Sequence, residues 1–212
     1  MFLSRIQFDT KSKDILKYLS SASKIHGIVE SCFPKIYKKN DARRHLWRID
    51  YLNGKLFLLM VSPEKPEFPD HLNVIGCFAA ETKNYDSFLQ HLATGQQWHF
   101  RLTANPTIKV STVQNPKGKI FNECTREQQL SWLLARCVKH GFLTDGENCV
   151  IKNVHWIKFT KREGNYVRFQ AVTFEGILTI SDVALFRGLL IGGIGREKAY
   201  GMGLLTVAQR IQ

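Results

Sequence analysis

Long apolar runs are missing from this chain of 212 residues. No apolar stretch in it approaches the roughly 18 residues that a membrane-spanning helix needs. The opening residues, MFLSRIQFD, carry charge and lack the apolar segment of a secretory signal peptide. We therefore expect a chain that has no membrane-spanning helix and is not secreted.

The five cysteines are widely spaced, in the pattern of neither a disulfide framework nor a metal site. The motifs CxxC and HExxH are absent, and an odd number of cysteines without a secretion signal is typical of reduced thiols. Cys137 and His140 lie three residues apart on a predicted helix, which favours a core thiol near a helix-terminal histidine. We predict a cytoplasmic protein with no metal site and no small-molecule cofactor.

The familiar nucleotide-binding motifs are missing too. Residues 192–205, GGIGREKAYGMGLL, hold five glycines together with an Arg and a Lys. Glycine N–H groups beside a cation can bind phosphate, but neither Walker A nor G-x-G-x-x-G is present. The segment therefore indicates either a phosphate-bearing partner or a tight connection between a helix and a strand, and it disfavours a nucleotide-using enzyme.

Acidic residues are few beside basic ones. The chain has 30 Lys and Arg against 18 Asp and Glu, a formal net charge of +12. Nucleic acid or an anionic membrane is the counter-charge that such a surface attracts. The charges are interleaved with apolar residues rather than gathered in tails, which is typical of the surface of a folded domain.

Hydrophobic periodicity predicts a similar order of elements in the two halves of the chain. In the first half we expect a strand at 2–8, a helical segment at 13–32, a hairpin at 44–61 turning at Asn53-Gly54, and a short helix then an edge strand within 72–92. In the second half we expect a strand at 98–110, a basic loop at 115–119, a helix capped by Thr125 and Gln128 and ended by Gly141, a hairpin turning at 163–165, a helix capped by Asp182, and a closing strand.

Strand, helix, strand, strand, helix, strand is the ferredoxin-like order. We predict an α+β protein of tandem ferredoxin-like (RRM-like) domains, at 1–92 and 98–212, the second ending in the glycine-rich loop. One sheet face of this fold is the RNA platform of the RRM. Phe159, Phe169 and Phe174 are candidates for base stacking there, although core packing is the better prediction for most of them.

Four stretches resemble one known family. They are HGIVESCFP at 26–34 with the following DARRHLWRID, FRLTANPT at 100–107, FEGILTI at 174–180, and the terminal GIGREKAYGMGLL. In this order they resemble the CRISPR-associated CasE-type endoribonucleases, the precursor-RNA-processing subunits of the Cascade complex. The resemblance covers nearly the whole chain.

The resemblance implies a function and its partners. It implies metal-independent cleavage of CRISPR repeat RNA at the 3′ base of its stem-loop, with the product kept bound and carried into Cascade alongside the other subunits. The alternative is a non-catalytic RNA-binding module of the same fold. Cleavage without metal uses the ribose 2′-OH as nucleophile and leaves 5′-OH and 2′,3′-cyclic phosphate ends, and no metal-ligand cluster is visible in the sequence to supply activated water instead.

Histidine suits the proton transfers of this reaction, but composition does not choose among seven of them. In an unbroken helix His26 shares a face with Ile15, Leu19 and Val29, which favours a core histidine. The poor helix sequence at 20–23 favours a break that frees it. The resemblance matches His26 to the family's catalytic histidine, as acid or as base. Relatives can carry a tyrosine three residues earlier, where this chain has Ser23 beside Lys24, a candidate for transition-state stabilisation.

Basic residues in three segments are the candidate RNA contacts, together with one on a strand. The resemblance implies that the tip of the second-half hairpin grips the RNA stem. Arg101 alternates with Phe100 and Leu102, so we expect it on the opposite strand face, toward a cleft. The candidates are Lys158, Lys161 and Arg162 at the hairpin tip, Lys117 and Lys119 in the basic loop, Arg196 and Lys198 in the glycine-rich loop, and Arg101.

Overall fold

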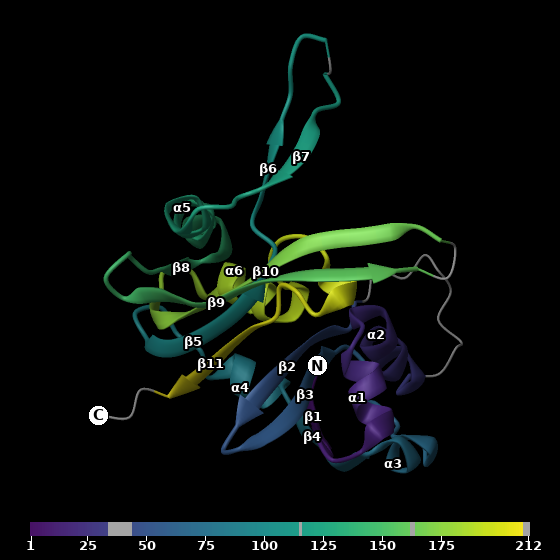
Figure 1. Ribbon diagram of the computed structural model, residues 1–212. Coiled ribbons are helices and arrows are strands. Elements are labelled where there is room, and N and C mark those ends of the chain that lie inside the picture. The colour runs from purple at the N-terminus through teal and green to yellow at the C-terminus, as the bar shows by residue number, and fades with distance from the viewer. Residues whose placement is uncertain (34–43, 115, 162–163, 210–212) are drawn as a thin grey trace.

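Two large antiparallel sheets, the helices that cover them and a separate two-stranded hairpin make up the computed structural model (Figure 1). The structure describes residues 1–33, 44–114, 116–161 and 164–209. The mixed fold with ferredoxin-like topology that the sequence predicts is confirmed. The exact limits of the two domains, at 92 and 98, stay a prediction.

The first sheet has the strand order β2-β3-β1-β4, the ferredoxin-like order. Its turn at Asn53-Gly54 forms as predicted, with both residues at positive φ, 50° and 75°. The elements of this half are β1 (Phe2–Phe8), α1 (Lys13–Leu19), α2 (Ala22–Ser31), β2 (Leu46–Leu52), β3 (Lys55–Ser62), α3 (His71–Ile75), β4 (Cys77–Asn84) and α4 (Asp86–Gln90).

The second sheet repeats this order as β11-β5-β10-β8, with β9 also paired to β10. Thr125 and Gln128 form the predicted capping box of α5, and the Asp182 carboxylate accepts hydrogen bonds from the first turn of α6. The elements are β5 (Gln97–Ala104), α5 (Arg126–Cys137), the 3₁₀ turn η1 (Val138–His140), β8 (Phe142–Leu143), β9 (Cys149–Thr160), β10 (Tyr166–Ile180), α6 (Val183–Gly192), the 3₁₀ turn η2 (Lys198–Tyr200) and β11 (Leu205–Gln209).

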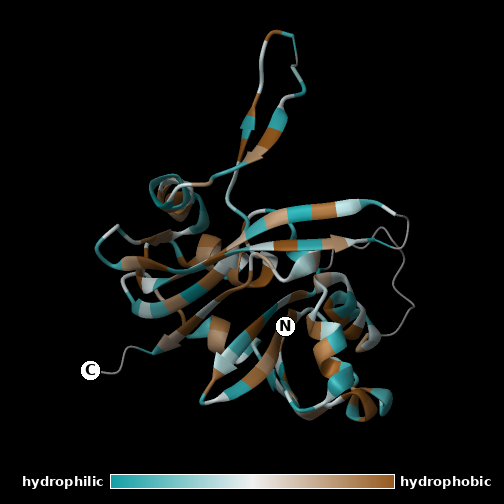
Figure 2. Cartoon of the chain, in the orientation of Figure 1, coloured by the Kyte–Doolittle hydropathy of each residue, from teal (hydrophilic) through white to brown (hydrophobic). Residues whose placement is uncertain are grey.

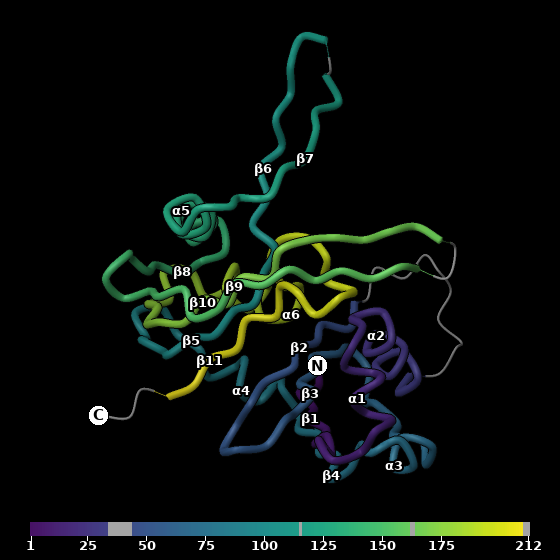
Figure 3. Tube along the Cα trace, viewed as in Figure 1, coloured from purple at the N-terminus to yellow at the C-terminus, as the bar shows by residue number. Residues whose placement is uncertain are grey.

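The predicted strand at 98–110 is wrong in one respect. It ends at Ala104 and resumes after Pro106 as β6 (Thr107–Val110), which pairs with β7 (Lys119–Asn122) as a separate hairpin. Proline cannot donate to a sheet ladder, and the chain leaves the sheet there. Lys119 therefore lies in a strand rather than in the basic loop. Figure 3 shows this hairpin standing away from the body of the molecule.

The helical segment at 13–32 is broken in the middle. α1 ends at Leu19, Ser20 is its C-cap, and extended Ser21 begins α2. Serine competes with the helix by bonding locally to the backbone, and the Ser20 hydroxyl donates to the Lys17 carbonyl. α2 can therefore take its own direction, so the face on which His26 lies is no longer set by the apolar stripe of α1.

One hydrophobic core crosses from one half of the chain to the other. Leu46 and Val61 of the first sheet pack in the same buried cluster as Phe100, Phe174 and many residues of the second half. A second cluster lies between the first sheet and helices α1, α2 and α3. Figure 2 shows the alternation of apolar and polar residues along the strands that allows this burial. Among the described residues, no helix is both long and apolar enough to cross a bilayer.

A buried arginine joins the two sheets. Arg48 on β2 is 2% exposed and donates from Nε and Nη2 to the carboxylate of Asp50, at 2.8 and 2.6 Å. Its Nη1 donates to the carbonyls of Arg101 and Leu204, both at 2.8 Å, and Nη2 also donates to the Thr206 hydroxyl at 2.6 Å. One side chain of the first sheet thus satisfies main-chain groups of β5 and of the segment leading into β11.

We expect Arg48→Met to lower the free energy of unfolding by about 3–5 kcal/mol, because it leaves the Asp50 carboxylate buried without its main partner. Urea denaturation measures this loss. The matched control is Arg5→Met: the Arg5–Glu81 ion pair has side chains 45% and 51% exposed, so its removal should cost at most about 1 kcal/mol. Equal losses in the two variants would show that Arg48 does not join the sheets.

Candidate active site

His26 lies on α2 where this helix meets the second half of the chain. Its side chain is 35% exposed, so the helix break leaves it neither in the core nor free in solvent. Its ring meets that of Tyr200 edge to face, with centroids 6.2 Å apart and an interplanar angle of 71°. Tyr200 comes from η2 in the glycine-rich loop. The site therefore combines an N-terminal helix with a C-terminal loop.

The Glu30 carboxylate lies near both His26 and a second histidine, His45. Glu30 Oε1 lies 3.0 Å from Nδ1 of His45 and 3.8 Å from Nδ1 of His26. His45 is held by stacking on Phe33, with ring centroids 3.7 Å apart. His26 Nδ1 is itself buried and has no hydrogen-bond partner among the described residues. Glu30 is thus hydrogen-bonded to His45 and acts on His26 mainly through charge.

The pKa of His26 is lowered from its ordinary value of 6.5. Burial is the largest cause, because the charged imidazolium loses hydration. The Glu30 carboxylate opposes this shift and His45 adds to it. The hydrogen bond from His45 in turn lowers the pKa of Glu30. At neutral pH His26 is therefore mainly the neutral imidazole, beside an ionised carboxylate.

The glycine-rich loop is tied down at several points. Lys198 Nζ donates to the carbonyls of Gly192 and Gly193 at 2.6 and 2.8 Å, and Trp47 Nε1 donates to the Ala199 carbonyl at 3.1 Å. Gly201 has φ +83°, and a Cβ there would lie 2.7 Å from the Trp47 ring. Only glycine suits this position. These contacts hold the glycine-rich loop in one conformation and fix the position of Tyr200.

The hairpin of β9 and β10 supplies the third side. Phe159 and Phe169 pack on the Tyr200 ring, with centroids 4.8 and 6.1 Å away. Together with Phe174 they are buried, so the prediction of core packing is correct for all three. Lys161 Nζ lies 5.8 Å from the centroid of the same Tyr200 ring. The hairpin thus brings a cation next to the residue that contacts His26.

The other predicted contact residues are spread over the molecule. Lys158 is exposed on β9, and Arg196 is exposed in the glycine-rich loop. Lys24 is exposed on α2, and its Nζ donates to the Lys17 carbonyl. Lys117 and Lys119 belong to the projecting hairpin (Figure 1), and Arg162 lies outside the described residues. The amine of Lys198 donates to carbonyls of its own loop. The roles of these residues in RNA binding stay predictions.

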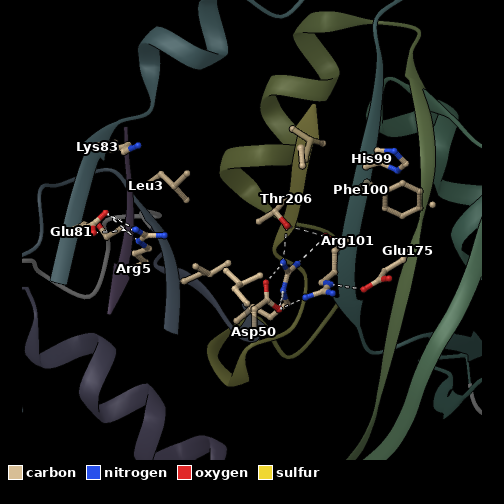
Figure 4. A pocket seen from close by; sticks show the side chains of 17 residues that line it. Leu3, Arg5, Asp50, Glu81, Lys83, His99, Phe100, Arg101, Glu175 and Thr206 are labelled. Atoms are coloured by element: carbon tan, nitrogen blue, oxygen red, sulfur yellow. Dashed lines mark hydrogen bonds and ion pairs between the residues drawn. The ribbon is translucent and has the colours of Figure 1, made fainter. Parts of the chain in front are cut away.

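Arg101 lies in a different place, a cavity of about 550 Å³ between the two sheets. Figure 4 shows its guanidinium beside Glu175 and Asp50, with which it makes ion pairs of 2.5 and 3.5 Å. Its charge is thus met by carboxylates. The residues that line this cavity include neither His26 nor Tyr200. The structure does not bring Arg101 to the His26 site.

Sequence reasoning missed several residues that the structure brings forward. In the sequence Tyr200 stands out only as one residue of a glycine-rich string, and no motif marks Glu30. Trp156 and Arg168 also form an exposed stack across β9 and β10, with the guanidinium 4.1 Å from the ring centroid. The alternation of the two strands was visible in the sequence, but the register that pairs them was not.

Comparison with known proteins identifies the chain. A family model described as CRISPR associated protein matches residues 1–209. The chain belongs to this family. It is 26% identical over 219 residues to the CRISPR-associated endoribonuclease Cse3 of Thermus thermophilus, covering 98% of this chain and 100% of that protein. It is 31% identical over 129 residues to the Cascade subunit CasE of Escherichia coli, covering 55% of this chain and 60% of that one.

Solved structures of family members have the same fold. A structure of the CRISPR endoribonuclease Cse3 bound to a 19-nucleotide RNA superposes with a TM-score of 0.82 at 25% identity. The match covers 99% of this chain and 100% of the other. The resemblance expected from four short stretches is confirmed over the full length.

Because the Glu30 carboxylate raises the pKa of His26, Glu30→Gln should lower this pKa further below 6.5. Titration of the His26 ring proton by NMR measures the change. Glu127→Gln, which removes an exposed carboxylate on α5, is the control and should leave the His26 titration unchanged. A higher or unchanged pKa in Glu30→Gln would show that the carboxylate does not act on His26.

Proposed function

We propose that this protein is an endoribonuclease that cleaves CRISPR repeat RNA at the 3′ base of its stem-loop and stays bound to the product as a Cascade subunit. The observation that carries the proposal is the full-length relationship to a protein named as a CRISPR endoribonuclease. The match over part of the chain to a protein named as a Cascade subunit supports the proposal that this protein is a Cascade subunit. The net charge of +12 suits an RNA partner.

In the proposed mechanism, the nucleophile is the ribose 2′-OH beside the scissile phosphate. Neutral His26 accepts the proton of this hydroxyl, since a pKa lowered by burial keeps the ring unprotonated at neutral pH. The 2′ oxygen forms a bond to phosphorus and the bond from phosphorus to the 5′ oxygen breaks. The 5′ oxygen leaves as a hydroxyl after taking up a proton, and the other fragment ends in a 2′,3′-cyclic phosphate.

Cations near His26 would stabilise the extra negative charge of the transition state. Lys161 is a candidate, because its amine lies 5.8 Å from the centroid of the Tyr200 ring, which also contacts His26. Lys24 belongs to the same helix as His26, but its amine donates to the Lys17 carbonyl 3.1 Å away. We therefore assign charge stabilisation to Lys161 first and to Lys24 second.

His26→Ala should lower the single-turnover cleavage rate by roughly 10²–10⁴, the usual contribution of a positioned acid or base. RNA affinity should stay nearly constant, because proton transfer acts in the transition state. His71→Ala, at an exposed position on α3, is the control and should cleave normally. Normal cleavage by His26→Ala would remove His26 from the mechanism.

The same assay tests the nucleophile and the enzyme itself. A repeat RNA with one 2′-deoxy nucleotide just upstream of the cut should bind but not be cleaved, and EDTA should leave cleavage of the all-RNA substrate intact. Cleavage of the deoxy substrate would refute attack by the 2′-OH. Tight binding of the all-RNA substrate without any cleavage would instead indicate the non-catalytic RNA-binding module.

The double variant Lys158→Ala, Lys161→Ala should bind repeat RNA with a salt dependence flatter by up to about two units in the log–log slope, one for each lost phosphate contact. Equilibrium binding at several salt concentrations measures the slope. Lys11→Ala, Lys55→Ala removes the same charge from exposed positions of the first half and is the matched control. Identical slopes in the two variants would mean that the hairpin does not contact phosphate.

A further inference from the structure

The imidazole of His26 lacks the usual means of orientation. Active-site histidines are commonly aligned by a hydrogen bond from one ring nitrogen to a carboxylate or a carbonyl. Here Nδ1 is buried with no hydrogen-bond partner among the described residues, and the Glu30 oxygen at 3.8 Å is beyond hydrogen-bonding distance. Among the described residues, the ring–ring contact that the structure shows for His26 is with Tyr200, and this contact can hold the imidazole.

Tyr200 is well suited to hold a neighbour, because it is itself held on two sides. The main chain before it is fixed by the bond from Trp47 Nε1 to the Ala199 carbonyl. Its ring is packed by Phe159 and Phe169 at the edge of a small buried cluster. An edge-to-face contact between rings restricts both tilt and distance. Because Tyr200 is held in place, its contact with His26 restricts the orientation of the imidazole.

We propose that Tyr200 is a positioning residue for His26, orienting the imidazole for proton transfer by the contact between the two rings. The proposal rests on the proposed function of His26. The phenol hydroxyl has no part in it. Burial is the largest cause of the lowered pKa of His26, and the Tyr200 ring is one of the groups that lie against the imidazole, so loss of this ring should move the pKa up toward 6.5.

Two substitutions separate the ring from its hydroxyl. Tyr200→Phe keeps the ring and should cleave within about twofold of the wild type. Tyr200→Leu removes the ring and should slow single-turnover cleavage by up to about tenfold, the rate equivalent of one aromatic contact, with RNA affinity unchanged. The His26 titration, followed by NMR, should shift upward in Tyr200→Leu and stay in place in Tyr200→Phe.

Tyr51→Leu is the control, because Tyr51 is an aromatic residue of β2 that is 62% exposed and takes no part in the packing of Tyr200. It should change cleavage and the His26 titration less than Tyr200→Leu does. If Tyr200→Leu does not fold, Tyr200→Met fills a similar volume without a ring and carries the same expectations.

Three outcomes would overturn the proposal. The first is wild-type cleavage and titration in the variant without a ring. The second is an equal loss of rate in Tyr200→Phe, which would assign the effect to the hydroxyl. The third is an effect of Tyr51→Leu as large as that of Tyr200→Leu. If the wild-type protein does not cleave repeat RNA at all, the proposed function fails. The NMR titration still tests the contact, so the two failures are distinguishable.

Discussion

The guanidinium of Arg48 connects the two halves of this protein at the level of the main chain. Arg48 lies on β2, and its charge is neutralised by Asp50, two residues later on the same strand. Its guanidinium also donates to the carbonyls of Arg101 and Leu204 in the second half of the chain. A buried charge of this kind is stable only when all of its donors find partners. Here the partners lie on both sheets, so the sheets must stay in one relative position for the charge to remain satisfied.

The candidate active site depends on that position. His26 belongs to a helix that packs on the first sheet, whereas Tyr200 and Lys161 belong to the second half of the chain. Leu204, which accepts a bond from Arg48, follows Tyr200 by only four residues. A shift of one sheet against the other would separate the imidazole from its aromatic neighbour before it disturbed either sheet. The shared hydrophobic core and the buried arginine oppose such a shift.

Local chemistry made much of the fold predictable from the sequence. The Asn53-Gly54 turn, the capping box of Thr125 and Gln128, and the Asp182 cap each depend on residues only a few positions apart. The family's four stretches made His26 the candidate histidine, and its catalytic role stays a prediction. What escaped depends on distant pairing. No periodic pattern in the sequence indicates the register of β6 with β7. None indicates the contact of His26 with Tyr200, which lies 174 positions later.

The packing of Trp47 against Gly201 sets a rule for the divergence of related sequences. The indole occupies the space where a side chain at 201 would begin, and it also donates to the carbonyl of Ala199. A smaller residue at 47 would open room at 201 but release the loop, and a larger residue at 201 would expel the indole. Because the positive φ of Gly201 also favours glycine whatever residue stands at 47, the two positions, more than 150 residues apart in the chain, should both stay unchanged during evolution.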